Sequence, residues 1–373
     1  MRLTSFRIIT LCAVATNRLI AQDSTVAVDS GPPRYHNRLI GLPYVSYSPQ
    51  TKLQFGVAGG YQFKWPGMGR NELTRPSYLA ANFAYTTKSQ WVAFLGTSLY
   101  SPTSRWWLSA DIAAGYFPVF YYGIGPHTTA ADTNLMQNHF LRLQIRPLHR
   151  VGRELYLGPY YRLVSVFDVD WQFPARIAAG LPGGKGGVNS GMGLTALVEG
   201  RNSSTTPTRG HFLQLDYLLQ AGGIGSDFDY SHLAVDARAY VPVRHGRDVI
   251  ALTVYGQFNG SGVPVQTMAF LGNETSQSVM RGAYLGRFRD RHELVAQADY
   301  RGHLKGRFGY VVFGAAGNVF GSPGNGVFDD PKFTYGTGLR FNVNPSDPLN
   351  IRVDYTLTTF HGGGLSIGAT EAF

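Results

Sequence analysis

The stretch Lys52–Lys64, KLQFGVAGGYQFK, alternates apolar side chains with small or polar ones almost without a break. Leu53, Phe55 and Val57 fall on one face of an extended chain, whereas Gln54 falls on the other. A period of two predicts a β-strand with one apolar and one polar face. The same alternation recurs along most of the chain, so the polypeptide is predicted to be all-β.

The alternating segments are long and numerous. We count about sixteen between residues 42 and 373, typically of about ten residues or more, which is the length that a tilted strand needs to cross a bilayer. Strands of soluble proteins are usually about half as long. In segment 350–358, Arg352 and Asp354 share the polar face, which would line a lumen while the apolar face meets lipid. We therefore predict a transmembrane antiparallel β-barrel of about sixteen strands.

Composition supports this fold and excludes several functions. Aromatic residues make up 13% of the chain and charged residues only 15%, with 46 glycines, as is typical of barrels with aromatic girdles. The net charge is +10, but the arginines are spread over alternate strand positions, so no nucleic-acid partner is expected. The ten histidines lack metal-ligand spacing and no Gly-x-Ser-x-Gly motif is present. We expect no catalytic residue, metal or cofactor, and no enzyme.

The N-terminal residues predict export. Residues 1–21 resemble a signal peptide, with a basic start, a short apolar core and Ala21 at a plausible cleavage position. Residues 22–38 are polar and contain proline, and are expected to form a flexible periplasmic leader. The barrel would occupy 39–373. This organisation predicts the outer membrane of a Gram-negative bacterium, with outer-membrane lipid as the immediate partner.

The longest late connection, 259–290, ends in an arginine-rich segment. Its residues Met280–Arg291 read MRGAYLGRFRDR, between two alternating segments. If the first strand runs outward, this connection and the other long ones all lie on the outer side, as outer-membrane barrels require. So many arginines need acidic partners, and Asp290 offers a local one.

This segment resembles a signature of the BamA/TamA superfamily, also called the bacterial surface antigen family. In that family the sixth outer loop carries Val-Arg-Gly-Phe/Tyr, folds into the barrel and is held there by its arginine. Arg281 and Gly282 match the signature, while Ala283 replaces the aromatic residue and Tyr284 follows one position late. The resemblance implies an inward-folded sixth outer loop that is held in place by Arg281, Gly282 and Tyr284.

The family's acidic partner for this arginine is missing. Phe313–Gly317 aligns with the family's Phe-x-Asp-x-Gly strand motif, but Ala315 stands where the aspartate would be. Alternation places Glu293 and Asp299 on the lumen face of the strand after the loop. We expect one of these two carboxylates to replace the missing acid.

Two further matches concern the inner side of the barrel. The run Arg201–Gly210 resembles the family's inner turn, in which Pro-Thr-Lys/Arg-Gly precedes a strand, and Arg201, Pro207 and Gly210 carry the likeness. A last strand at 363–373 that ends in Phe373 resembles the signal read by barrel assembly machinery. That machinery is the implied partner for insertion of this chain.

The resemblance also implies a function. Full-length members carry periplasmic POTRA domains, for which 22–38 is too short, so a barrel-only branch is expected. Such a barrel would assist insertion or translocation of proteins, or of lipids, with client proteins or a separate periplasmic protein as partners. Leu42–Ser48 is a short first strand that contains Pro43, which predicts a weak junction with the last strand. The alternative is a passive pore or a structural surface-antigen barrel.

Overall fold

The computed structural model describes most of the chain from Asn37 onward, and these residues belong to one compact unit. The described ranges are 37–48, 52–65, 76–178, 180–204, 206–272, 279–343, 350–360, 362–369 and 371–373. The expected signal peptide, 1–21, and the expected leader up to residue 36 lie outside them. Arg38, placed in the leader by the sequence, instead begins the first strand.

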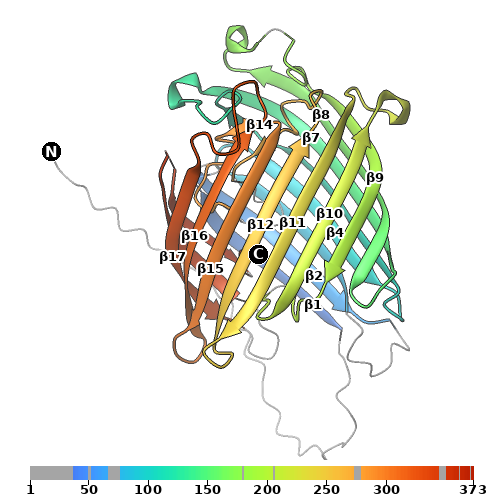
Figure 1. Cartoon of the computed structure of the whole chain (residues 1–373), viewed down its shortest axis with the longest axis vertical. Coiled ribbons are helices and arrows are strands. Elements are labelled where there is room, and N and C mark those ends of the chain that lie inside the picture. The colour runs from blue at the N-terminus through green and yellow to red at the C-terminus, as the bar shows by residue number, and fades with distance from the viewer. Residues whose placement is uncertain are drawn as a thin grey trace, which may run out of the picture. The chain divides into compact units, whose positions relative to one another are not determined.

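Sixteen strands of the described residues follow one another in a single antiparallel sheet that curls into a barrel (Figure 1). They are β1 (Arg38–Ser48), β2 (Lys52–Phe63), β3 (Ser77–Thr86), β4 (Trp91–Tyr100), β5 (Trp106–Tyr116), β7 (Asn134–Arg150), β8 (Leu155–Trp171), β9 (Gly187–Glu199), β10 (Gly210–Gln220), β11 (Tyr230–Val243), β12 (Asp248–Asn259), β15 (His292–His303), β16 (Phe308–Phe320), β17 (Lys332–Asn342), β18 (Asn350–Thr358) and β19 (Gly364–Ala369). The predicted all-β barrel of about sixteen strands is confirmed.

The connections between the long strands contain short elements. β6 (Val119–Tyr121) adds to the end of β7, and β13 (Ala269–Phe270) pairs with β14 (Arg289–Asp290) as a small ribbon apart from the main sheet. Three single turns of 3-10 helix complete the set: η1 (Ala130–Asp132), η2 (Pro174–Arg176) and η3 (Gly222–Ile224). No helix in the described ranges is long and apolar enough to cross a membrane.

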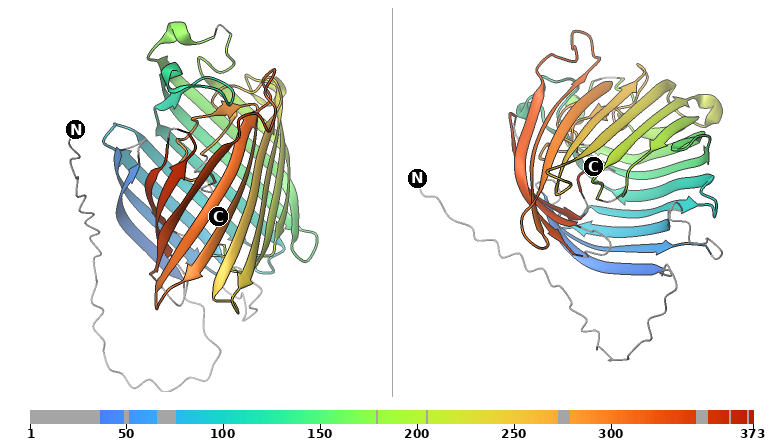
Figure 2. Two further views of the ribbon diagram at one scale, coloured as in Figure 1. Left: turned by 60° about the vertical axis from the view of Figure 1, so that its left-hand side comes forward. Right: turned by 60° about the horizontal axis from the view of Figure 1, so that its bottom comes forward.

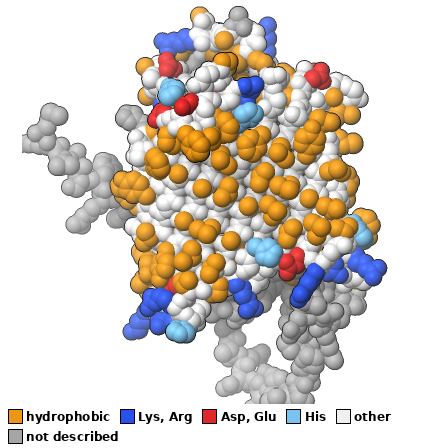
Figure 3. Space-filling model, in the orientation of Figure 1, with side chains coloured by type: hydrophobic (Ala, Val, Ile, Leu, Met, Phe, Trp, Pro, Cys, Tyr) orange, Lys and Arg blue, Asp and Glu red, His pale blue; other side chains and the backbone are white. Residues whose placement is uncertain are grey.

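The two faces of the strands differ as the alternation predicts. On β2, Leu53, Phe55 and Val57 point outward and are 44–59% exposed. Figure 3 shows apolar side chains as a broad belt across the face of the barrel wall that it draws, with charged side chains gathered toward the two ends. Exposed apolar area on this scale is unstable in water, so the belt is the surface that a bilayer would cover.

Long connections gather at one end of the barrel, at the top of Figure 1. The sixth connection at this end, residues 260–288 between β12 and β15, is called loop 6 below. Figure 2 shows the barrel from its other end, where the C-terminal residues lie inside the ring of strands.

The first and last strands meet at a junction that we call the seam. Every other neighbouring pair of the sixteen strands is joined by an antiparallel ladder, with a register shift only between β7 and β8, whereas no ladder joins the described residues of β1 and β19, although the two strands approach each other. The predicted short first strand is wrong, because β1 begins four residues earlier than Leu42 and pairs with β2 along its whole length. Pro43 lies inside this strand, which fits its position at an edge of the sheet.

Candidate functional site

Loop 6 descends into the lumen and packs there through apolar side chains. Met280 is fully buried, and its backbone N–H donates a hydrogen bond to the Gln297 side chain at 3.0 Å. The loop and the wall share one apolar cluster: Leu271, Val279, Met280, Ala283, Phe288, Val295, Ala315 and Val319. Burial of this cluster stabilises the inward position of the loop.

Arg281 forms the centre of the site. Its guanidinium donates one hydrogen bond to Asp299 of β15 and another, at 3.1 Å, to Asp354 of β18. Its Cζ also lies 3.6 Å from the centroid of the Phe313 ring on β16, in a cation–π contact. The side chain is 2% exposed, so both ion pairs are shielded from water. We call Arg281 with Asp299 and Asp354 the latch.

Further charges surround the latch. Arg340 bonds Asp354 at 2.6 Å and Glu371 at 2.9 Å, and Arg352 approaches Asp354 at 3.6 Å. The network thus extends from loop 6 across the lumen to the residues that follow β19. Buried carboxylates that each serve more than one guanidinium offset part of the desolvation cost of this cluster.

Gly282 lets the loop approach the wall closely. Its φ is +83°, a region that favours glycine. A Cβ there would lie 2.6 Å from the Thr356 side chain, and the Gly282 carbonyl accepts a hydrogen bond from Gly363 N–H at 2.8 Å. Gly363 belongs to the hairpin between β18 and β19, so loop 6 touches the connection that leads into a seam strand.

Of the two acids named from the sequence, Asp299 contacts Arg281 and Glu293 does not. Glu293 is buried on the same face of β15, and within the described ranges it forms no ion pair. Asp354 was missed as a partner, although its alternation with Val353 had placed it on the lumen face. Ala315, at the position of the family's aspartate, packs under the apolar side of loop 6.

Tyr284 has a different position from the one that the resemblance implies. Its ring packs against Phe120 and Tyr122 of the third outer connection, with centroids 5.8 and 6.1 Å away, and burial raises the pKa of its hydroxyl. Arg287 donates to the backbone and hydroxyl oxygens of Thr128 in the same connection. Tyr284 therefore ties loop 6 to another outer loop and stands apart from the latch.

The inner turn is built around its own ion pair. Arg201 forms a two-pronged contact with Glu199, at 3.0 and 2.6 Å, which supplies the turn with an acidic partner. Gly210 begins β10 with a φ of +100°. The Pro207 carbonyl accepts a hydrogen bond from Arg301 at 3.4 Å.

Phe373 requires a correction. β19 ends at Ala369, so Phe373 is not on the last strand and does not face lipid. Its side chain is 4% exposed and packs inside the lumen with Tyr240, Val249 and Ala251. Arg301 donates to the Phe373 carbonyl at 3.0 Å as well as to Pro207, and so joins the end of the chain to the inner turn.

This arrangement gives a first prediction. We expect Arg301→Gln to release residues 371–373 from the lumen, because hydrogen bonds from a charged donor contribute ~1.5–3 kcal/mol each. Hydrogen–deuterium exchange in the C-terminal peptide should become about tenfold faster or more. The matched change Arg105→Gln, in an exposed inner turn, should leave that exchange unaltered. Unchanged exchange in Arg301→Gln would show that apolar packing of Phe373 holds the segment by itself.

Comparisons with known proteins agree with this fold. No protein-family model and no curated protein matches the sequence. The crystal structure of BamA from Haemophilus ducreyi lacking POTRA domains 1–3 matches with a TM-score of 0.56 and 14% identity, over 91% of this chain and 70% of that one. CdiB from Acinetobacter baumannii matches with a TM-score of 0.56 and 12% identity, over 90% of this chain and 59% of that one.

The chain therefore has the fold of the BamA and CdiB barrels. The resemblance to the BamA/TamA superfamily, first indicated by the Arg281 segment, is confirmed at the level of the fold. This chain spans less than two thirds of the CdiB chain.

Proposed function

We propose that this protein resides in the outer membrane and assists the insertion or translocation of polypeptides, or of lipids, through its seam. The single observation that carries the proposal is the absence of a ladder between the described residues of β1 and β19, in a sheet whose other neighbouring strands are all joined by ladders. Outer-membrane lipid and client proteins would be its partners, together with a separate periplasmic protein and the machinery that inserts the barrel itself. The proposed role is to move polypeptides or lipids and involves no catalysis.

An unpaired strand edge has a specific chemical capacity. Its free N–H and C=O groups can form a ladder with an incoming strand, which is the mode of recognition called β-augmentation. On its outer face β1 also carries Leu39 and Val45, which are 80% and 59% exposed. A client strand could gain both backbone hydrogen bonds and apolar contacts there.

Loop 6 is placed to influence the seam. Arg281 of the loop binds Asp354 on β18, and Gly282 accepts a hydrogen bond from Gly363 in the hairpin that leads into β19. Movement of the loop would therefore remove contacts that fix the last hairpin. This connection supports a seam whose opening depends on the position of the loop.

The test locks the seam with a disulfide. With Cys12 replaced, Ile367→Cys is combined in turn with cysteine at Leu39, Gly41 or Val45, all on the outer face. Oxidised protein in liposomes is expected to fold a small client barrel at least about tenfold more slowly than the same protein after reduction. The control pair Leu215→Cys and Val235→Cys, directly opposite each other on β10 and β11, should have no effect.

Planar-bilayer recordings test the alternative function, which is a passive pore. A large, steady conductance combined with equal client folding in oxidised and reduced protein would contradict the proposal and favour a passive pore. Low conductance is expected, because loop 6 and residues 371–373 both lie in the lumen.

A further inference from the structure

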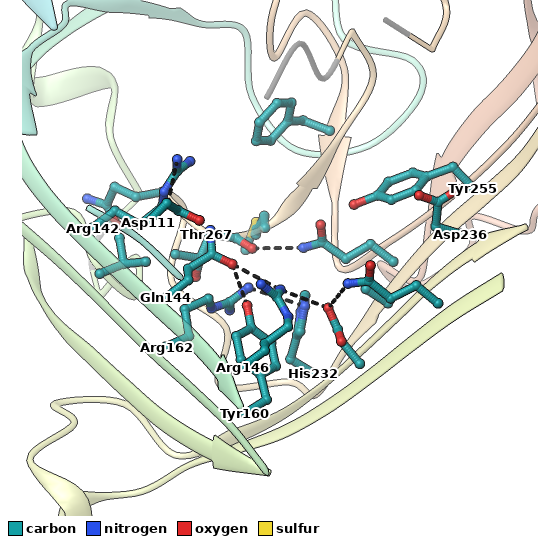
Figure 4. Close-up of a pocket in the computed structure, with 18 of the residues that line it drawn as sticks. Asp111, Arg142, Gln144, Arg146, Tyr160, Arg162, His232, Asp236, Tyr255 and Thr267 are labelled. Atoms are coloured by element: carbon teal, nitrogen blue, oxygen red, sulfur yellow. Dashed lines mark hydrogen bonds and ion pairs between the residues drawn. The ribbon is translucent and has the colours of Figure 1, made fainter. Parts of the chain in front are cut away.

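A cavity of about 700 Å³ occupies the lumen beside loop 6, between the loop and the wall formed by β5 to β12 (Figure 4). Its lining includes Arg289 and Gly286 of the loop region but no residue of the latch. Cavities that hold small molecules are of about 300–1,000 Å³ and combine apolar walls with a few placed polar groups. This cavity has both the size and the mixed lining of such a site.

The wall of the cavity changes character along the strands. Phe140 of β7 is in register with Val166 of β8, and both line the part nearer the outer loops. Two residues further inward, Arg142 lies opposite Val164. After another two residues, Gln144 lies opposite Arg162. Along these two strands the wall of the cavity therefore changes from apolar nearer the outer loops to cationic further inward.

Most arginines of this inner part have their own carboxylate. Arg142 binds Asp111 at 3.1 Å and Arg146 binds Asp216 at 2.9 Å. Arg146 also stacks on the Tyr160 ring, with its Cζ 3.7 Å from the centroid. These pairs are internally neutral and need no further anion.

Arg162 differs from them. Its one hydrogen bond to a described residue is from Nη1 to His232 Nε2, at 3.2 Å. His232 Nδ1 lies 2.7 Å from Asn259 Oδ1, and the Asn259 amide nitrogen donates to a backbone carbonyl, so Oδ1 is the acceptor there. Nδ1 therefore carries the hydrogen, and Nε2 offers Arg162 a lone pair but no negative charge.

The remaining donors of Arg162 are unused. Its Nε and Nη2 are buried and have no hydrogen-bond partner within the described ranges, and no described carboxylate forms an ion pair with it. A buried guanidinium without a counter-charge is unfavourable unless an anion completes it. Figure 4 shows Arg162, Arg146 and His232 grouped on one side of the cavity.

We propose that this cavity binds a small organic anion, with a phosphate head on Arg162 and an apolar body along Phe140 and Val164. Phosphate suits the site because a guanidinium attracts it and forms charge-assisted hydrogen bonds with it, and Arg162 has no described carboxylate of its own. The position of the apolar wall fixes the orientation of the ligand, with its body toward the outer loops. The site is independent of the role proposed for the seam.

The test compares three soluble probes by isothermal titration of the full chain in phosphatidylcholine nanodiscs. Phenyl phosphate should bind saturably, inorganic phosphate at least about fivefold more weakly, and phenol without saturation. Arg162→Gln should weaken phenyl phosphate at least about tenfold. Arg153→Gln, which removes the same charge from an exposed inner turn, should leave the affinity unchanged. Phe140→Ala should weaken phenyl phosphate but not inorganic phosphate.

A second variant is expected to act in the opposite direction. Asp216→Asn keeps the shape of the side chain but frees Arg146, so phenyl phosphate should bind about threefold more tightly. This variant keeps the proposal testable if Arg162→Gln does not fold. Absence of saturable binding by the native chain, native affinity in Arg162→Gln, or weaker binding in Asp216→Asn would each overturn the proposal.

Discussion

Replacing Arg281 with alanine is expected to lower the free energy of unfolding by about 3 kcal/mol. Breaking a buried ion pair by removing one partner typically costs ~3–5 kcal/mol, because a charge is left without compensation. The lower end of this range is expected for Arg281→Ala, because both aspartates keep other partners. Asp354 would keep Arg340 at 2.6 Å, and Asp299 would keep Arg301 at 3.9 Å and a hydrogen bond from Gln297 at 3.2 Å. Urea titration of the barrel folded in liposomes measures the change.

A double-mutant cycle separates the latch from general damage. Arg281→Ala and Asp299→Ala should couple by ~1 kcal/mol or more, since the two side chains touch, and Asp354→Ala should couple with Arg281→Ala in the same direction. Glu293→Ala is the matched control, a buried acid on the same strand that does not contact Arg281. Its effect should add to that of Arg281→Ala within ~0.5 kcal/mol.

The position of loop 6 gives an independent readout. Arg281→Ala should increase cleavage of the loop by added trypsin at Arg287 or Arg291, because loss of the latch lets the loop leave the lumen. Arg281→Lys should be intermediate, since an ammonium cannot match the planar fork that reaches two carboxylates. Additive energies for both aspartates, together with unaltered cleavage, would show that the apolar cluster around Met280 holds the loop without the latch.

The architecture of the barrel follows closely from local sequence. Alternation is a property of each strand alone, so it indicates the number of strands and their two faces without knowledge of their neighbours. It also places Asp299 and Asp354 on the lumen face. What alternation cannot give is which lumen residues meet across the barrel, because that depends on strand tilt and stagger around the whole ring. Asp354 therefore became recognisable as a partner only in three dimensions.

Gln144 and Phe373 illustrate the same difficulty. Period two places Gln144 in the lumen, and from that alone an arginine there is expected to be tolerated. In the structure its side-chain oxygen accepts hydrogen bonds from Tyr160 and Arg146, so the substitution would remove an acceptor and add a like charge. Phe373 continues an alternating pattern, yet the strand stops at Ala369 and the ring turns inward to Tyr240, where lumen packing outweighs the local pattern.

The second large effect concerns the outer surface. Val57→Arg on β2 is expected to lower the free energy of unfolding by ~2–4 kcal/mol, the range for an arginine that faces lipid near the midplane. Val57 is 59% exposed and lies in the middle of its strand, on the face that forms the apolar belt. The guanidinium would have to reach the interface or draw water into the bilayer.

Ala58→Arg is the matched control, one residue further along the same strand. Ala58 is in register with Asn82 of β3, whose side chain accepts a hydrogen bond from Tyr44, so this face is polar. An arginine there could stay solvated in the lumen, and we expect a change below ~1 kcal/mol. Urea titrations in liposomes of two thicknesses measure both variants, and only the Val57→Arg penalty should grow in the thicker bilayer, because the distance to the interface increases. Equal penalties for the two variants would mean that the apolar face of β2 is not the one in contact with lipid.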